Sequence, residues 1–449
     1  MSCVVRVLPG RRDLLPLAAA QPARYPGLLE SAARGNARAR HDILFAFPEG
    51  GLRLDAHDLA HAAGRAHVAR FLDALDQAWF AARTQRIDDG LPFHGGWLLY
   101  LGYELAGEIE PSLRLPPAGD ALPVALAMRC PAAVIVDHAN DRMLLVAEAG
   151  REELLRLMQA DLDATPAFEP APPRVVAIEE DEAARFLDGV ERVHEHLRAG
   201  DVFQVNLSRG WHAHCEPAPA PAAVHAALRR ANPAPFAGLL QHGGWAIASS
   251  SPERLVEVRG DLVQTRPIAG TRPRRTGDDD AALMRELAGH PKERAEHVML
   301  IDLERNDLGR ICVPGSVRVD EIMAVESYAH VHHIVSNVSG RLREGTTPAQ
   351  AIRAVFPGGT ITGCPKVRCM QIIAALERSG RGAYTGSLGY LDRNGDLDLN
   401  ILIRTLTLEG NAVHFRAGAG IVADSIAGRE LDETRAKARG LLRALGLDG

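Results

Sequence analysis

The stretch between Val355 and Leu442 holds the densest arrangement of glycines and charged residues in the chain, and it limits the fold more than any other feature. It opens with a glycine-rich loop, FPGGTITGCPK at 356–366, followed by a run at 367–376 whose apolar residues have helical spacing. Glycines let a backbone approach a ligand closely, and the free amides at a helix start attract an anion. The pattern predicts a site for a small acidic substrate. Three loop residues are its candidate contacts: Thr362, Gly363 and Lys366.

An arginine in the next predicted strand also indicates an anionic partner. In the segment NILIRTLTL at 400–408, period-two alternation places Arg404 on the same face as Leu402 and Leu406. A guanidinium without a partner is costly on such an apolar face. A partner strand, 412–416, runs into the glycine segment AGAGIV at 417–422. The two strands together predict a carboxylate clamp.

A charged helix is expected after this hairpin, in RELDETRAK at 429–437. Glu430, Glu433 and Lys437 fall at i, i+3 and i+7 and therefore share one face of the helix. A solvated helix face with ion pairs has the same pattern. The helix alone does not decide between this interpretation and a binding role, but its neighbours favour binding.

Composition narrows the class of protein. The chain has 449 residues, of which 46% are hydrophobic and 24% charged, enough for a large core or two domains. A net charge of −6 argues against nucleic-acid binding, which needs a basic face. The six cysteines form no CxxC pair or disulfide framework, and we expect neither a signal peptide nor a membrane span. These features predict a reduced, cytoplasmic protein.

A proline- and alanine-rich connector at 164–173 predicts a boundary between two regions, residues 1–165 and 175–447. In the first region we expect short strands and a helix over 55–83, and we interpret the segment FHGGWLLYLGY at 93–103 as core packing and a turn. The second region begins with a predicted helix over 179–199 and a strand over 202–208. Alternation places Gln204, Asn206 and Ser208 on one face of that strand.

A predicted helix beginning near Pro291 carries Glu293, Glu296 and His297 at helical spacing, and we expect a loop at 306–309 after it. The following strand, at 330–336, contains His333. A histidine beside β-branched residues in a strand is more typical of a core than of a catalytic base. The sequence shows no internal repeat.

These motifs, taken in order, resemble the chorismate-utilising enzymes, and specifically the synthase subunits that form aminodeoxychorismate or anthranilate. The resemblance covers about residues 185–445 densely, through VFQVNLSR, SSSPERL, RPIAGTRPR, KERAEHVMLIDLERNDLGR, HHIVS, FPGGTITGCPK, GAYTGSLGY, LNILIRTL, AGAGIV and ELDET. The N-terminal part matches more loosely, through LLES and PFHGGWLLYLGYE. The resemblance implies an α+β fold of two facing antiparallel sheets flanked by helices, with the active site in a cleft between them.

The resemblance also implies a metal and a substrate clamp. Mg²⁺ would be held at Glu296 and Glu433, with Glu293 and Glu430 close by, so that two helix faces meet across an oxygen-seeking cation. The cation would bind the ring carboxylate of chorismate and assist departure of the 4-hydroxyl. The positions that match the family's carboxylate clamp are Tyr384, Arg404, Gly418, Gly420 and Lys437.

Three further positions take their roles from the same resemblance. Glu253 corresponds to the acid that protonates a leaving hydroxyl, and His333 to a histidine that handles protons in the anthranilate-forming members. Relatives that add water have a lysine where this chain has Gln204, and a neutral amide cannot act as a base. The nucleophile is therefore expected to be ammonia. Because nothing in the chain resembles a glutaminase, the resemblance implies a separate glutamine amidotransferase partner.

The segment PIAGT at 267–271, with Ala269 and Thr271 as candidate catalytic positions, bears on the product. The best-known aminodeoxychorismate-forming enzymes have a lysine at the position of Ala269, and alanine is the anthranilate-type residue. The sequence TITG in the glycine loop and the N-terminal half favour the aminodeoxychorismate type, which supplies the precursor of p-aminobenzoate and folate. We favour amination at C4 without a covalent lysine intermediate. Anthranilate formation is the alternative, and a non-enzymatic binding subunit is a third.

Overall fold

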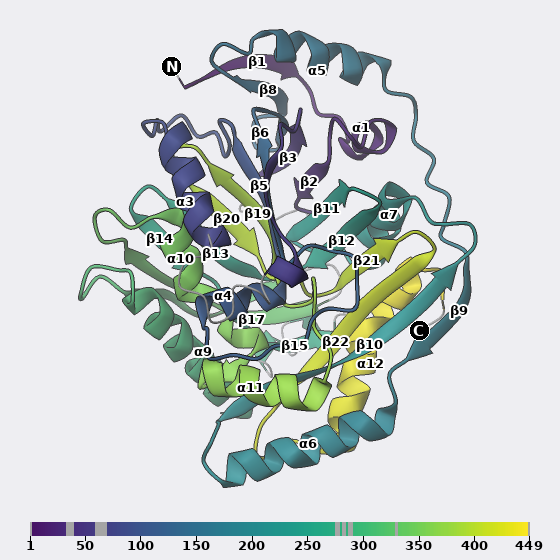
Figure 1. Cartoon of the computed structure of the whole chain (residues 1–449), viewed down its shortest axis with the longest axis vertical. Coiled ribbons are helices and arrows are strands. Elements are labelled where there is room, and N and C mark those ends of the chain that lie inside the picture. Colours follow the sequence, from purple (N-terminus) through teal and green to yellow (C-terminus); the bar gives the residue numbers. More distant parts are fainter. Residues whose placement is uncertain are drawn as a thin grey trace.

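The computed structural model describes residues 2–32, 40–58, 70–273, 279–280, 284–285, 291–327 and 331–447. Side chains at 269, 271–273, 291–293, 327 and 331–332 lie outside that description. Two antiparallel sheets with flanking helices make up the fold, as predicted (Figure 1). Among the described helices, none combines the length and apolar character that a membrane crossing requires.

The larger sheet joins strands from both ends of the chain. An additional strand, β9 (Val175–Glu180), pairs with β10 outside the main path. In spatial order the main path is β1 (Cys3–Pro9), β8 (Arg142–Glu148), β7 (Ala132–Asp137), β3 (His41–Ala46), β2 (Gly27–Glu30), β11 (Phe236–His242), β12 (Trp245–Ser251), β21 (Thr405–Glu409), β22 (Ala412–Ile421), β10 (Gln204–Cys215) and β18 (Gly363–Cys364).

The smaller sheet is also built from both regions of the chain. Here β16 (Arg318–Ser327) pairs with β17 beside the main path. The order of that path is β15 (Ile268–Pro273), β17 (Val331–Arg341), β14 (Leu262–Thr265), β13 (Arg254–Arg259), β20 (Leu397–Asn400), β19 (Ser387–Asp392), β5 (Gly96–Leu101), β6 (Ala125–Cys130) and β4 (Gly51–Leu54). Residues 1–165 and 175–447 therefore share both sheets, and the division into two domains stays a prediction.

The helices cover the outer faces of the sheets, while the inner faces pack on each other. One core cluster contains Ile43 and Phe45 of the larger sheet together with Tyr100 and Tyr390 of the smaller one, all buried. The short α4 (Ala106–Ile109) and the 3₁₀ turns η1 (Tyr103–Leu105) and η2 (Gly359–Ile361) lie in connections. The longer helices are α1 (Leu15–Ala20), α3 (Phe71–Ala82), α5 (Glu153–Ala164), α6 (Ala183–Arg198), α7 (Pro221–Ala231), α9 (Pro291–Gly309), α10 (Pro348–Val355), α11 (Lys366–Glu377) and α12 (Ala427–Ala444).

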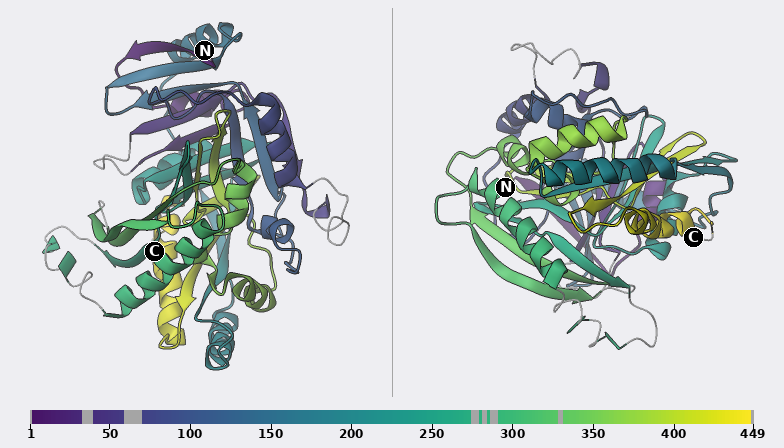
Figure 2. Two further views of the ribbon diagram at one scale, coloured as in Figure 1. Left: turned by 90° about the vertical axis from the view of Figure 1, so that its left-hand side faces the viewer. Right: turned by 90° about the horizontal axis from the view of Figure 1, so that it is seen from below.

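The elements nearest the predicted site lie at the end of the larger sheet formed by β10, β18 and β22. Here α12 packs on β22 and α11 on β10, and α6 contacts both β10 and α12. Figure 1 shows these elements together in its lower half, and the views in Figure 2 place the N-terminal strands toward the opposite end of the molecule. Helix α9 packs on β15 and β17 of the smaller sheet. The two helices that carry the predicted metal ligands, α9 and α12, thus pack on different sheets.

Several predicted boundaries are wrong for identifiable reasons. The helix expected from 179 begins at Ala183, because Val175–Glu180 pairs with β10 as an edge strand. The loop expected at 306–309 belongs to α9, which continues to Gly309. Of the helix expected over 55–83, α3 occupies the last part, and residues 59–69 lie outside the described residues.

Candidate active site

Two neighbouring strands, β10 and β22, form the floor of the candidate site. Asn206 lies opposite Gly420 and Ser208 opposite Gly418 in the antiparallel register. A Cβ at Gly420 would collide with Nε2 of Gln204, and one at Gly418 would lie 2.9 Å from Oδ1 of Asn206. The glycines of β22 therefore make room for the polar face of β10, as the alternation in the sequence predicted.

Two acceptor atoms on this face have no hydrogen-bond partner in the described part of the chain. Gln204 donates from Nε2 to Oε1 of Glu296 at 3.2 Å, which fixes the orientation of the amide. Its own Oε1 and Oδ1 of Asn206 are buried and accept no hydrogen bond from the residues that the structure describes. Buried oxygens of this kind are normally satisfied. Because these oxygens lie beside Gly418 and Gly420, they are positioned to accept hydrogen bonds from a ligand.

Arg404 contributes a guanidinium to the same region, although not from a strand. The single strand predicted over 400–408 is interrupted, because β20 ends at Asn400, β21 begins at Thr405 and Arg404 has a left-handed φ of 51°. Its guanidinium makes no hydrogen bond or ion pair with any residue that the structure describes. Burial lowers the pKa of Arg404, and the nearby Glu253 carboxylate opposes that shift. The predicted need for an anion therefore remains.

Glu253 lies in the turn between β12 and β13 and is 5% exposed. The hydroxyl of Thr360 donates to its Oε1 at 2.7 Å. Burial raises the pKa of Glu253 to about 7, although the Thr360 hydrogen bond and the charges of Lys437 and Arg404 act in the opposite direction. A carboxyl with this pKa carries a transferable proton near neutral pH, which suits a general acid.

The glycine-rich loop is anchored mainly through contacts within the protein. Thr362 donates from Oγ1 to the carbonyl of Gly358 at 2.9 Å, and its own carbonyl accepts the N–H of Asn206 at 3.0 Å. Gly363 has φ 126°, and a Cβ there would collide with the carbonyl of Gln204. The structure gives both residues a role in holding β10, and their contact with substrate stays a prediction.

The side chain of Lys366 makes its contacts within the protein. Its Nζ donates to Oδ2 of Asp307 at 2.5 Å and to the carbonyl of Val355 at 3.1 Å. Close to this pair, burial raises the pKa of Glu304 to about 8, with the charge of Asp307 adding to the effect. Lys366 thus forms an ion pair between α9 and the start of α11, and its contact with substrate stays a prediction.

Helix α12 connects its charged face to the floor of the site. Lys437 donates from Nζ to the carbonyl of Gly418 at 2.9 Å and pairs with Glu433 at 2.8 Å. Glu430 lies in the first turn of the same helix. The side chain of Tyr384 is buried, and its hydroxyl lies 2.8 Å from where a Cβ of Gly418 would be. Of the predicted clamp residues, Tyr384 and Lys437 thus both lie against Gly418.

The acids predicted to hold a metal lie on two helices that pack on different sheets. Glu296 of α9 accepts a hydrogen bond from Gln204 of β10, and Glu433 of α12 pairs with Lys437, which donates to the carbonyl of Gly418 in β22. Within the described part of the chain, no three His, Cys, Asp or Glu side chains form a complete metal cluster, and the side chain of Glu293 lies outside the description. Mg²⁺ usually takes one or two carboxylates and completes its shell with water and substrate oxygens. The donor set fits a cation that shares its ligands with the substrate.

The remaining predicted positions lie on the smaller sheet. His333 is 2% exposed in β17, opposite Thr271 of β15 and Glu326 of β16. Ala269 and Thr271 belong to β15, but their side chains lie outside the described part. A second histidine, His297, contacts the hydroxyl of Ser336 at 2.6 Å, and burial lowers its pKa to about 4. It is a neutral residue of the interior.

Sequence reasoning missed a residue from the N-terminal region that supports this site. Glu104, directly after β5, accepts the backbone N–H of Arg381 at 2.7 Å and that of Gly382 at 3.2 Å. These N–H groups lie just before Tyr384. The segment at 93–103 was interpreted as core packing, and β5 is fully buried as expected. The sequence hints at this supporting role only through a glutamate that follows a strongly apolar strand.

A sequence profile of chorismate binding enzymes matches residues 37–443. The chain is 44% identical over 366 residues to an anthranilate synthase component I-like protein of Synechocystis sp., covering 81% of this chain and 75% of that protein. It is 40% identical over 391 residues to aminodeoxychorismate synthase component 1 of Bacillus subtilis, covering 82% and 81%. The crystal structure of anthranilate synthase component I from Streptococcus pneumoniae is similar with a TM-score of 0.79 and 31% identity, covering 91% and 93%.

Proposed function

The chain belongs to the chorismate binding enzymes, and on that premise we propose that it aminates chorismate at C4 to 4-amino-4-deoxychorismate. In the net reaction a C–N bond forms to ammonia and the C4–O bond breaks. The hydroxyl leaves as water after receiving the proton of Glu253, and the ammonium formed by attack loses a proton to solvent. Glu253 supports this role because its pKa of about 7 matches proton donation at neutral pH.

The observation that carries the proposal is the amide of Gln204 on the floor of the site. Its Nε2 is engaged with Glu296 and its Oε1 has no described partner, so this position provides no amine to activate water. An amide cannot serve as a base, and a nucleophile that needs no deprotonation by this residue fits better. Ammonia meets that requirement.

Arg404, Tyr384 and the backbone at Gly418 would hold the substrate carboxylates. Arg404 supplies a positive charge near Glu253, while Lys437 donates a hydrogen bond to the carbonyl of Gly418. If Mg²⁺ is bound by Glu296 and Glu433, it would polarise the ring carboxylate and favour loss of the 4-hydroxyl. The residues of this site would orient the dicarboxylate and exclude water from its ring.

A separate glutamine amidotransferase subunit would supply the ammonia. Five of the six cysteines are buried, and Cys364 is partly exposed. Burial raises the thiol pKa of all six, so none has the lowered pKa of a nucleophilic cysteine. Glutamine hydrolysis within this chain is therefore unsupported, and ammonium at high pH should replace the partner.

Anthranilate formation is the second candidate, favoured by one residue. Ala269 cannot form the lysine adduct of the best-known C4-aminating enzymes, so ammonia could instead attack C2, with pyruvate lost afterwards. Relatives of both names match the chain at similar identity. The sequence TITG in the loop and the character of the N-terminal half support our preference for C4.

Product analysis tests the proposal. The protein is incubated with chorismate, Mg²⁺ and ammonium at high pH, with and without an aminodeoxychorismate lyase that converts the C4 product to p-aminobenzoate. We expect p-aminobenzoate only when the lyase is present, and no turnover with glutamine in place of ammonium. Fluorescent anthranilate as the sole product would overturn the assignment in favour of the second candidate.

A further inference from the structure

One buried guanidinium, that of Arg381, contacts β10, the glycine-rich loop and the turn that carries Tyr384. Arg381 lies in the connection between α11 and β19 and is 4% exposed. It donates from Nη2 to the carbonyl of Asn206 at 2.7 Å and from Nη1 to the carbonyl of Ile361 at 3.0 Å. These carbonyls belong to β10 and to the glycine-rich loop. A single side chain therefore joins the floor of the site to the loop beside it.

Arg381 also fixes the turn that carries Tyr384. Its Nη1 lies 3.4 Å from the hydroxyl of Thr385, and its guanidinium carbon lies 5.5 Å from the centre of the Tyr384 ring. On its other side, the ring of Tyr103 lies 5.0 Å away. Such contacts between a guanidinium and two aromatic faces are favourable and directional. They set the position of a ring whose hydroxyl lies against Gly418.

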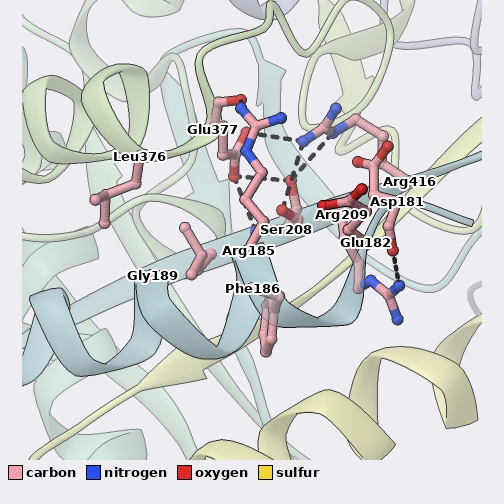
Figure 3. Close-up of a pocket in the computed structure, with 11 residues that line it drawn as sticks. Asp181, Glu182, Arg185, Phe186, Gly189, Ser208, Arg209, Leu376, Glu377 and Arg416 are labelled. Carbon is pink, nitrogen blue, oxygen red and sulfur yellow. Dashed lines mark hydrogen bonds and ion pairs between the residues drawn. The ribbon is translucent and has the colours of Figure 1, made fainter.

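Glu377 holds the guanidinium in this orientation. Its two carboxylate oxygens accept from Nε and Nη2 of Arg381 at 3.0 and 2.7 Å. The same carboxylate accepts from Arg416 at 3.1 Å and from both the N–H and the hydroxyl of Ser208 at 2.8 Å. Figure 3 shows the dashed lines that join Glu377 to Ser208 and Arg416 among the residues that line a pocket.

The charge state of this pair is unambiguous. Burial alone would raise the pKa of Glu377, but the guanidinium groups of Arg381 and Arg416 outweigh that effect and lower it. With these contacts all five N–H donors of Arg381 are used, which few buried arginines achieve through so many separate segments. Lysine would retain the charge but not the planar fork, so it could not make the same set of bonds.

We propose that the Arg381–Glu377 pair is the positioning element of the substrate clamp, setting Asn206, the loop at Ile361 and the ring of Tyr384 in register for one dicarboxylate. The pair touches none of the atoms that would react, so it acts through the groups it holds. This inference rests on the chorismate-binding function, and not on which carbon is aminated.

The test compares Arg381→Lys with a matched control, Arg254→Lys. Arg254 is also largely buried, pairs with both oxygens of Asp398 and lies over an aromatic ring, but it makes none of the contacts with Asn206, Ile361 or Tyr384 that distinguish Arg381. Chorismate Kd, KM and kcat are measured for each, with the Tm of each variant. KM is followed by chorismate consumption, so the readout is the same whichever product forms.

We expect both variants to lose similar thermal stability, while only Arg381→Lys weakens chorismate binding, by about 10-fold or more, a displacement of roughly 1.4 kcal/mol. Its KM should rise more than its kcat falls, because the clamp acts on the bound substrate before the chemical step. Equal Kd values for Arg381→Lys and wild type would overturn the inference, as would an equal loss of binding in Arg254→Lys.

Glu377→Gln provides a second variant should Arg381→Lys fail to fold. It retains the shape of the side chain and an acceptor for Ser208, and it removes the charge that orients Arg381. We expect a smaller rise in chorismate Kd, about threefold, with Tm lowered. An unchanged Kd in folded Glu377→Gln would contradict the role assigned to the pair.

Discussion

Two arginines near the floor of the site, Arg404 and Arg381, have opposite surroundings. The guanidinium of Arg381 uses all five donors within the protein, whereas that of Arg404 makes no hydrogen bond or ion pair with the described residues. A fully paired cation fixes the structure around it. An unpaired one in a buried setting destabilises the free protein and gains a partner only when an anion arrives. We therefore assign Arg381 a structural role and Arg404 a role in binding the substrate.

The same contrast holds for Asn206. Its backbone carbonyl accepts from Arg381 and its N–H donates to the carbonyl of Thr362, while its side-chain Oδ1 has no described partner. The chain thus satisfies the groups that hold β10 in place and leaves unsatisfied those that face Gly418 and Gly420. Unsatisfied groups gathered at one place mark a ligand site more sharply than burial or charge alone.

The largest effect on turnover is expected from a change at Glu433, one of the predicted metal ligands. Glu433→Gln removes a carboxylate charge from a partly exposed position and no core volume, so turnover of chorismate should fall by about 100-fold or more with Tm unchanged. The matched control is Asp432→Asn, an exposed acid one residue earlier on α12. Steady-state rates at saturating Mg²⁺ measure the difference. Full turnover in Glu433→Gln would remove this residue from the site.

Arg404→Met sharpens the comparison by separating stability from binding. Removing a half-buried charge that has no ion pair among the described residues should leave Tm unchanged or raise it, while KM for chorismate rises by about 10- to 100-fold because a carboxylate loses its cation. Arg381→Lys should instead lower Tm. Calorimetric Tm and steady-state kinetics of the two variants provide the readout. A lowered Tm in Arg404→Met would mean that this guanidinium is a structural residue like Arg381.

The smallest effect is a dependence on pH set by Glu253. Because burial raises its pKa to about 7, the proton it donates is present below that pH and lost above it. The ratio kcat/KM should therefore fall by up to about tenfold per pH unit on the alkaline side, once allowance is made for free ammonia. A flat profile from pH 6 to 9 at constant free ammonia would contradict its role as the acid.

Stability follows the same ionisation and gives an independent check. A carboxyl whose pKa is raised on folding stabilises the protein fully below its unfolded pKa, and this contribution is lost as the pH rises through the folded value. Glu253→Gln mimics the protonated form. Its Tm should equal that of wild type near pH 4, exceed it increasingly between about pH 5 and pH 7, and keep a constant excess above pH 7.

The motifs, through their resemblance to a known family, predicted the class of fold that the structure shows. Alternation in the sequence suggested an anionic partner for Arg404, which stays a prediction. It did not predict the break before Thr405, since a left-handed φ at an arginine is set by the surrounding structure. Local spacing also could not reveal that Lys366 pairs with Asp307, 59 residues earlier, or that Glu104 binds the backbone at Arg381, 277 residues later. Such contacts depend on how the two sheets meet.

The central claim is that Glu296 and Glu433 bind one metal whose shell is completed by the substrate that Arg404 holds. Calorimetric titration of Mg²⁺ into the protein, with and without saturating chorismate, tests it most directly. We expect chorismate to tighten Mg²⁺ binding by about 10-fold or more, Mg²⁺ to tighten chorismate binding by the same factor, and Glu433→Gln to abolish the coupling. Equal Mg²⁺ affinity in the presence and absence of chorismate would contradict the account.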